Sequence, residues 1–202
     1  MRFASIAVIA GAAMSLASCG TIVKITPVEK HDATPSSAYG YIAIRTTQER
    51  GTDIAFVVNN VDTGTTFNMP LEEDATWNST ENKRVAIIKV PPGRYAVTHW
   101  LTYATLTKSE FIEKAVTNPY LSYPFSVSPD TVIVLGDFMV GFDSDHRNGT
   151  DYWHWTIRPL HITRKKAQAA FVQSYPGFRG LEFACRLCTD TVRGIPDSDR
   201  QP

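Results

Sequence analysis

The chain has 202 residues, of which 43% are hydrophobic and 20% are charged, a composition typical of a globular protein with a full core. Its length favours one domain with terminal extensions. Lys and Arg together number 20 and so do Asp and Glu, so no whole-molecule field attracts polyanions. This balance argues against a nucleic-acid-binding protein.

Residues 1–18 form an export signal, because Arg2 is followed by an uncharged run from Phe3 to Leu16. That run is too short to span a bilayer as a helix. Leu-Ala-Ser-Cys, ending at Cys19, resembles the lipobox of bacterial lipoproteins, in which the Cys is acylated and becomes the first residue. The resemblance implies a membrane anchor on Cys19, and Gly20 favours the outer membrane. The alternative is an ordinary secretory signal that happens to be followed by Cys.

The remainder divides into a tether, a β domain and a tail. Residues 19–37 mix Pro, Ser, Thr and charges and predict a tether between lipid and domain. Residues 38–188 hold apolar runs bounded by turn residues, which predict a domain of short strands. The predicted strands are Ala38–Arg45, Ile54–Val58, Thr65–Met69, Val85–Val90, Tyr95–Leu101, Tyr123–Val127, Val132–Leu135, Phe138–Phe142, Tyr152–Ile157 and Leu181–Leu187. The polar residues 189–202 predict a flexible tail.

One short helix is expected near residues 163–173, where the apolar period changes to that of a helix. Thr163 suits its N-cap, and Pro176 with Gly177 ends it. The stretch Thr107–Ala115 is ambiguous, and we interpret it as a loop with at most one helical turn.

The stretch Val85–Thr102 predicts a hairpin around Pro91-Pro92-Gly93. Pro92 presets the first turn angle, and Gly93 is expected to supply the positive φ of a type II turn. Apolar residues on both parities of Val85–Val90 indicate a central position in the sheet.

Two motifs resemble a known family. Ile87–Val97, read IIKVPPGRYAV, resembles the PPGxY hairpin of transthyretin-like, carboxypeptidase-regulatory-like domains. Phe125–Gly136 is similar to an F-x-V-x-P-G-x-x-x-Y-x-G unit of uncharacterised bacterial lipoproteins, with Asp130 in place of the usual Gly. The resemblance implies a mainly β fold, an antiparallel β-sandwich of transthyretin (prealbumin) type with one short C-terminal helix. It transfers no catalytic residue.

Cys185 and Cys188 form a C-x-x-C pair, and export to an oxidising compartment favours a disulfide between them. Free or intermolecular thiols are the alternative, followed by redox or metal chemistry. A metal site would need further ligands, and a thioredoxin-like centre would need a βαβ context that the sequence lacks.

The densest aromatic cluster is Tyr152-Trp153-His154-Trp155. In a strand, Trp153 and Trp155 share one face, and Tyr152 and His154 share the other. One face is expected to complete the core, and core packing is the favoured interpretation for Trp153 and Trp155. The other face suits contact with a sugar ring or a partner protein, since Trp and Tyr contribute strongly to interfaces.

The stretch 143–151 is polar and is expected to be a solvated hairpin loop, with Asn148-Gly149 at its turn. A Ca²⁺ site is the alternative, and its oxygen ligands would come from Asp143, Asp145, Asn148 and Asp151. Against calcium, Arg147 stands where an oxygen ligand belongs, and no Glu closes the loop. A transition-metal site using His146 and His154 is a further alternative.

No recognisable nucleophile–base or acid–base constellation occurs, so we expect a non-catalytic protein without a cofactor. The hypothesis is a cell-envelope lipoprotein whose β-sandwich binds another envelope or secreted protein. The alternative is a module that binds a glycan or Ca²⁺ at the envelope surface.

Overall fold

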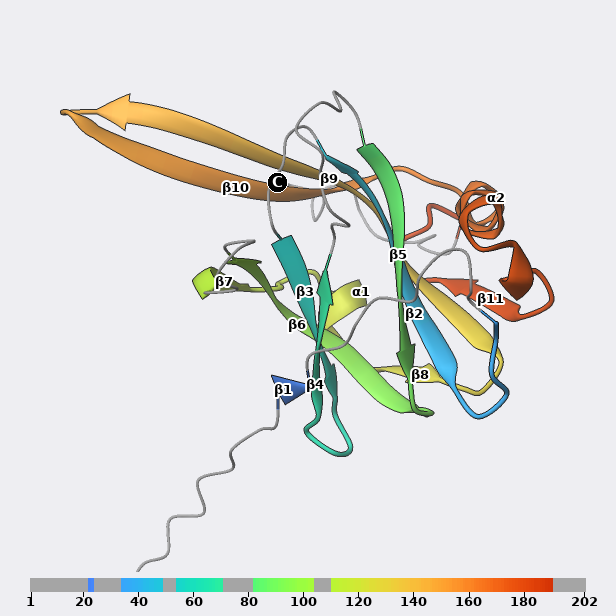
Figure 1. Cartoon of the computed structure of the whole chain (residues 1–202). Helices are drawn as coiled ribbons and strands as arrows, with labels where there is room; N and C mark the ends of the chain where they lie inside the picture. Colours follow the sequence, from blue (N-terminus) through green and yellow to red (C-terminus); the bar gives the residue numbers. More distant parts are fainter. Residues whose placement is uncertain (1–21, 24–33, 49–53, 71–81, 104–109, 191–202) are drawn as a thin grey trace, which may run out of the picture.

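The computed structural model describes residues 22–23, 34–48, 54–70, 82–103 and 110–190, and these form two β-sheets with short helices (Figure 1). The strands of sheet A are β1 Ile22–Val23, β3 Ile54–Asn60, β4 Thr66–Pro70, β6 Gly93–Tyr103, β7 Glu110–Ala115 and β8 Phe125–Val127. The strands of sheet B are β2 Gly40–Gln48, β5 Asn82–Val90, β9 Thr131–Arg147, β10 Thr150–Leu160 and β11 Glu182–Cys185. The helices are α1 Pro119–Ser122, α2 Arg164–Ser174 and the 3₁₀ turn η1 Pro176–Phe178. The predicted mainly β class is confirmed.

Strand pairing is mixed, whereas the expected sheets were antiparallel. Sheet A has the order β1-β4-β3-β6-β7 with β8 beside β6, and sheet B has the order β10-β9-β2-β5 with β11 beside β9. The pairs β1–β4, β2–β9 and β11–β9 run parallel, and the other ladders are antiparallel. Parallel neighbours need a long connection between them, and the segments that join these three pairs are all long.

Two buried clusters hold the sheets together. The main cluster draws on both sheets, and it includes Ile42, Phe56, Ile88, Tyr95, Leu135 and Phe138. The second cluster lies between the other face of sheet B and the C-terminal segment, and it includes Tyr41, Ala43, Val134, Phe171, Phe178 and Phe183. Where the C-terminal segment covers it, sheet B is therefore buried on both faces, which is why its strands contain continuous apolar runs there.

This double burial explains the error about Val85–Val90. Ile88 belongs to the main cluster and Ile87 to the second, yet β5 ends the strand order of sheet B and is not central. On the outer face, the Tyr175 hydroxyl donates a hydrogen bond to the Val85 carbonyl at 3.0 Å. Apolar residues on both parities thus show that both faces of β5 are covered. The outer face is covered by the C-terminal segment.

The predicted hairpin at Pro91-Pro92-Gly93 is wrong, because β5 belongs to sheet B and β6 to sheet A. The prolines form a corner between the sheets. Gly93 is the first residue of β6 and does not have the expected positive φ. A Cβ at Gly93 would lie 2.9 Å from Asn60 Nδ2, so glycine is needed for close approach, not for reversing the chain.

The corner is fastened by Tyr95, whose side chain is fully buried. Its hydroxyl donates to the Pro91 carbonyl at 2.6 Å. Burial raises the pKa of the Tyr95 phenol, and a hydrogen bond with Asn60 partly opposes that shift. The Tyr of the PPGxY motif thus closes the corner that precedes it.

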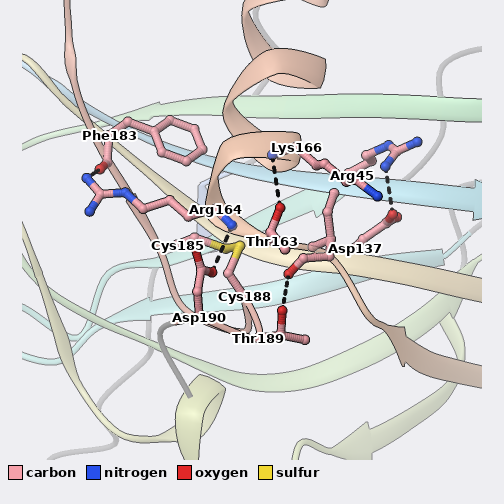
Figure 2. The surroundings of a disulfide bond; sticks show 11 residues. Arg45, Asp137, Thr163, Arg164, Lys166, Phe183, Cys185, Cys188, Thr189 and Asp190 are labelled. Atoms are coloured by element: carbon pink, nitrogen blue, oxygen red, sulfur yellow. Dashed lines mark hydrogen bonds and ion pairs between the residues drawn. A yellow bond between two sulfur atoms is a disulfide. The ribbon is translucent and has the colours of Figure 1, made fainter. Parts of the chain in front are cut away.

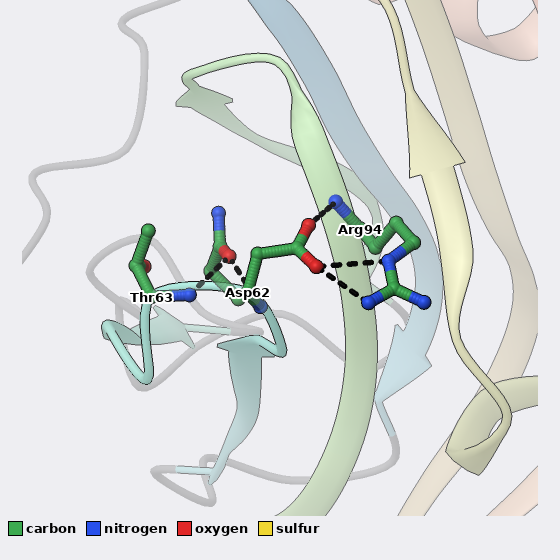
Figure 3. Close-up of polar contacts among 4 residues, drawn as sticks. Asp62, Thr63 and Arg94 are labelled. Atoms are coloured by element: carbon green, nitrogen blue, oxygen red, sulfur yellow. Dashed lines mark hydrogen bonds and ion pairs between the residues drawn. The ribbon is translucent and has the colours of Figure 1, made fainter.

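A second contact joins the corner to the turn after β3 (Figure 3). Asp62 accepts hydrogen bonds from the Arg94 backbone N–H at 3.1 Å, from Nε at 2.9 Å and from Nη2 at 2.6 Å. These bonds to Arg94 lower the pKa of the Asp62 carboxyl. Asn60 Oδ1 shapes the turn by accepting from the N–H groups of Asp62 and Thr63. Residues 60–65 and 91–95 therefore form one end of the molecule, which we call the corner end.

Asp130 adopts a backbone conformation that is costly for residues other than Gly. Asp130 has a φ of 55°, in the left-handed region that favours Gly. Its N–H donates to the Tyr39 carbonyl, and its own carbonyl accepts from Glu182 N–H. These two bonds hold Asp130 in a conformation that Asp tolerates better than most residues.

The local predictions at the helices were partly confirmed. Helix α2 begins after Thr163, whose hydroxyl accepts from Lys166 N–H, and ends before Pro176 as predicted. The loop predicted at Thr107–Ala115 is wrong, because Glu110–Ala115 forms β7 and pairs with β6. Pairing with a neighbouring strand outweighs the helical spacing of this short segment.

We predict that Tyr95→Phe lowers the free energy of unfolding by about 1 kcal/mol, because the Pro91 carbonyl loses its hydrogen bond. Urea unfolding of the purified chain measures this loss. Because the folded pKa of Tyr95 is raised, the wild type should also lose stability as pH rises above about 10, and Tyr95→Phe should lose less.

Tyr123→Phe is the matched control, because the Tyr123 side chain is 68% exposed. Equal stabilities for Tyr95→Phe, Tyr123→Phe and wild type would contradict the role given to Tyr95.

Candidate functional site

The most distinctive feature is a two-stranded arm that extends beyond the sheets (Figure 1). The pairing of β9 with β2 ends at Val140, which lies opposite Gln48. Strand β9 continues through Arg147, and β10 pairs with it along the whole extension. We define the arm as residues 141–156. Seven residues of β9 at about 3.4 Å each give it a length of roughly 24 Å.

The tip of the arm is a two-residue turn at Asn148-Gly149, and this turn was predicted. Asn148 has a φ of 52° and Gly149 a φ of 77°, the signs required by the type I′ turn that suits twisted hairpins. The expected polar loop over 143–151 is wrong in extent, because both strands stay paired from Arg147 and Thr150 inward. Polar residues here mark a solvated ribbon instead of a loop.

The aromatic cluster lies on this arm by register. Trp155 pairs with Phe142 and Trp153 with Ser144. His154 pairs with Asp143 and Tyr152 with Asp145. The side chains of Tyr152, Trp153, His154 and Trp155 lie outside the described residues, and so do those of Asp143 and Asp151.

The last described core contact of β10 is Ile157, which pairs with Val140 and packs against the main cluster. The aromatic run occupies the positions that follow toward the tip. Its backbone therefore lies where β2 no longer flanks the ribbon. The expectation that one aromatic face completes the core falls on side chains that lie outside the described residues.

At the arm tip, one of the carboxylates proposed to bind Ca²⁺ already has a cationic partner. The Arg147 guanidinium pairs with the Asp145 carboxylate. Within the described part of the chain, no group of three His, Cys, Asp or Glu side chains could hold a metal. Asp143 and Asp151, which complete the proposed Ca²⁺ ligand set with Asp145 and Asn148, have side chains outside the described residues, so that set stays a prediction.

Strand β9 has a β-bulge near Gly136, in the part of the strand that precedes the arm. The register of β2 and β9 shifts between Ala43 and Arg45, so β9 holds one extra residue there. Inward positions change accordingly from Ile133 and Leu135 to Phe138 and Val140, all in the main cluster. The bulge thereby keeps β9 apolar toward the core on both sides of Gly136.

A buried ion pair adjoins the bulge. Asp137 accepts from Arg45 Nη1 at 2.8 Å, and its side chain is only 7% exposed. Asp137 is paired with Arg45 on one side and with Leu160, the last residue of β10, on the other. Asp137 is therefore the position of β9 at which pairing with β10 begins. Because the carboxylate is buried, it needs the Arg45 guanidinium beside it.

Beside the bulge, the C-terminal segment is closed by a disulfide between Cys185 and Cys188 (Figure 2). Both cysteines are buried. The turn that they close carries Leu187, whose N–H donates to the Leu135 carbonyl at 3.1 Å. The arrangement fixes the turn over Gly136, because a Cβ there would lie 3.0 Å from Leu187 Cβ.

The segment after the disulfide caps α2. Asp190 Oδ1 accepts from Arg164 N–H at 2.8 Å (Figure 2). Thr189 N–H donates to the Ile162 carbonyl at 2.9 Å. The flexible tail predicted over 189–202 is therefore too long at its start, since residues 189–190 belong to the folded domain. Sequence reasoning missed this role, although Asp and Thr are typical helix-capping residues.

Comparisons with known proteins leave the family open. No family model matches the chain, and no curated protein matches it. Among solved structures, a leucine-rich repeat protein from Bacteroides thetaiotaomicron is 14% identical over 53% of this chain, with a TM-score of 0.34. The match spans 12% of that protein's length, and at this TM-score it supports no conclusion on fold or function. Among the described residues, no helix is long and apolar enough to cross a membrane.

We predict that Gly136→Ala lowers the free energy of unfolding by about 2–3 kcal/mol. The residue has a φ of 154° and contacts Leu187 and Phe138, so a methyl group adds both backbone strain and overlap. Thermal and urea unfolding measure the effect.

Gly180→Ala is the control, because nothing lies within 4 Å of a Cβ there and its φ is ordinary. It should change stability by less than about 1 kcal/mol. Equal effects of the two substitutions would contradict the close packing assigned to Gly136.

Proposed function

We propose that this chain is a non-catalytic lipoprotein of the bacterial cell envelope whose β9–β10 arm binds another envelope or secreted protein. Acylation of Cys19 anchors it, with the outer membrane as its location. The two sheets form a β-sandwich of the transthyretin-like type, and the arm is the binding element added to it.

Three features support the sandwich assignment. The main buried cluster takes residues from both sheets. Tyr95 of the PPGxY motif makes a specific bond to Pro91, and Asp130 has positive φ where the related unit has Gly. Each motif therefore performs a definite conformational task. The crossing from sheet B to sheet A at Pro91–Gly93 is a departure from the hairpin expected for the motif.

The observation that carries the binding role is the arm itself. An isolated two-stranded ribbon is marginally stable in water, so a ribbon that extends beyond its sheet gains stability when another surface covers it. Its sequence holds Phe142 and the run Tyr152–Trp155, and aromatic residues dominate the energetics of protein interfaces.

The outer edge of β10 offers a second means of contact. In the described strand order β10 is terminal, so its outer backbone groups can pair with an added strand. Pro159 lies near the root, where its missing N–H interrupts such pairing. Strand addition is therefore best accommodated toward the tip.

The test is capture from envelope extract by the acylated chain and by an arm-shortened variant. Deleting residues 142–147 and 150–155 leaves Gly141-Asn148-Gly149-Thr156. Gly141 and Thr156 are already opposite one another. Hydrogen-bonded and non-hydrogen-bonded pairs alternate along the ribbon, so removing six residues from each strand leaves the turn flanked by a pair of the same kind as Arg147 and Thr150. The shortened chain should melt at the same temperature as the wild type.

We predict that wild type captures a partner protein that the arm-shortened variant does not, and that Trp153→Ala and Trp155→Ala weaken binding of the purified partner by about tenfold or more. Tyr123→Ala, which removes an exposed aromatic outside the arm, should bind normally. Undiminished capture by the shortened variant would contradict the proposal. Arm-dependent binding of a glycan or Ca²⁺ in place of a protein would favour the alternative module.

A further inference from the structure

We propose that the domain stands on the membrane at its corner end and presents the arm tip away from the bilayer. The inference rests on the proposed acylation of Cys19. It adds an orientation, a membrane-facing surface and a reach for the binding element.

The first step is the pairing of β1. Ile22 and Val23 pair in parallel with Thr66 and Phe67 of β4, at the edge of sheet A. Residues 19–37 were expected to act as a tether along their whole length, and this short strand corrects that expectation. The paired backbone ties the chain to the domain close to its lipid.

The second step is chain length. Cys19 precedes Ile22 by three residues, so the two are at most about 11 Å apart even when fully extended. A flexible tether over the whole of residues 19–37 would have a root-mean-square length of roughly 24 Å. Pairing of β1 thus holds the domain near the bilayer and restricts its rotation.

The third step identifies the end that faces the lipid. Because β1 runs parallel to β4, the chain reaches β1 from the side on which β4 begins. Strand β4 begins immediately after the turn over residues 60–65, and Val61 N–H donates to the Arg94 carbonyl at 2.9 Å. This side is therefore the corner end, where sheets A and B are joined.

The fourth step places the arm. At the corner end Val90 is opposite Gly40, and Tyr41 is opposite Val132. At the other end Gln48 is opposite both Asn82 and Val140, and the arm continues from there. Figure 1 shows β1 low in the view and the arm at the top.

The register also gives the reach of the arm. From Val132 to Arg147 the strand advances fifteen residues, which corresponds to on the order of 50 Å along β9. Because β9 bends between the sheet and the arm (Figure 1), this length is the upper limit of the distance between the corner end and the tip.

The chemistry of the corner end fits a headgroup layer. Thr63, Gly64, Pro91 and Pro92 are exposed. Asp62 and Arg94, with side chains 41% and 61% exposed, pair with each other and cancel in charge. Such a surface is polar without a net field, so the acyl chains supply the attachment, and membrane binding should vary little with salt or anionic lipid.

The test uses the full acylated chain on phosphatidylcholine vesicles that carry an acceptor dye on a fraction of their headgroups. A donor dye is attached to Thr63→Cys at the corner end or to Thr150→Cys at the arm tip, both exposed threonines. Cys185 and Cys188 are joined in the disulfide, so the introduced thiol is labelled selectively. We expect efficient energy transfer from position 63 and little from position 150.

Two controls separate the possible failures. Vesicle binding by the wild type and its loss in Cys19→Ser tests the anchor, and absence of binding would refute the proposed function itself. Six Gly-Ser residues inserted between Gly20 and Thr21 should narrow the difference between the two dyes. Equal transfer from both positions of a vesicle-bound wild type, or a difference unchanged by the insertion, would overturn the orientation.

Discussion

The structure depends on a single strand, β9, that serves different neighbours along its length. Its first part lies between β2 and β11, and its residues alternate between the two buried clusters. Beyond the bulge at Gly136 it joins β10, and after Val140 these two strands continue alone as the arm. The same strand therefore links core packing, the disulfide-closed segment and the proposed binding element. A substitution at Gly136 should therefore disturb the core, the disulfide-closed segment and the arm together.

The corner end has a comparable role for the relation between the two sheets. The Tyr95 hydroxyl donates to the Pro91 carbonyl and Asp62 pairs with Arg94, so the end of β5 in one sheet and the start of β6 in the other are fixed at one point. Both sheets consequently share a corner end and an opposite end. That shared polarity lets the register of β1 and β9 place the anchor and the arm on different sides.

Much of the local structure was predictable from residues whose chemistry acts over a few positions. Thr163 before α2 and Asn148-Gly149 at the arm tip are examples. Strand partners were not predictable. Apolar residues at both odd and even positions indicate that both faces of a strand are covered, but they do not indicate which strands pair with it. The Pro91–Gly93 unit accordingly resembled a hairpin although it joins two sheets. The arm was mistaken for a loop because a solvated ribbon carries the same polar residues as a loop.

The central claim is that β9 leaves the sheet after Val140, and amide hydrogen exchange along this strand tests it most directly. Val132–Val134 and Asp137–Val140 have a paired strand on each side, whereas the arm is a two-stranded ribbon. The account predicts slow exchange up to Val140 and much faster exchange from Gly141 to Arg147. Uniformly slow exchange through Arg147 in the isolated protein would show that the arm is packed against the domain, and would contradict the account.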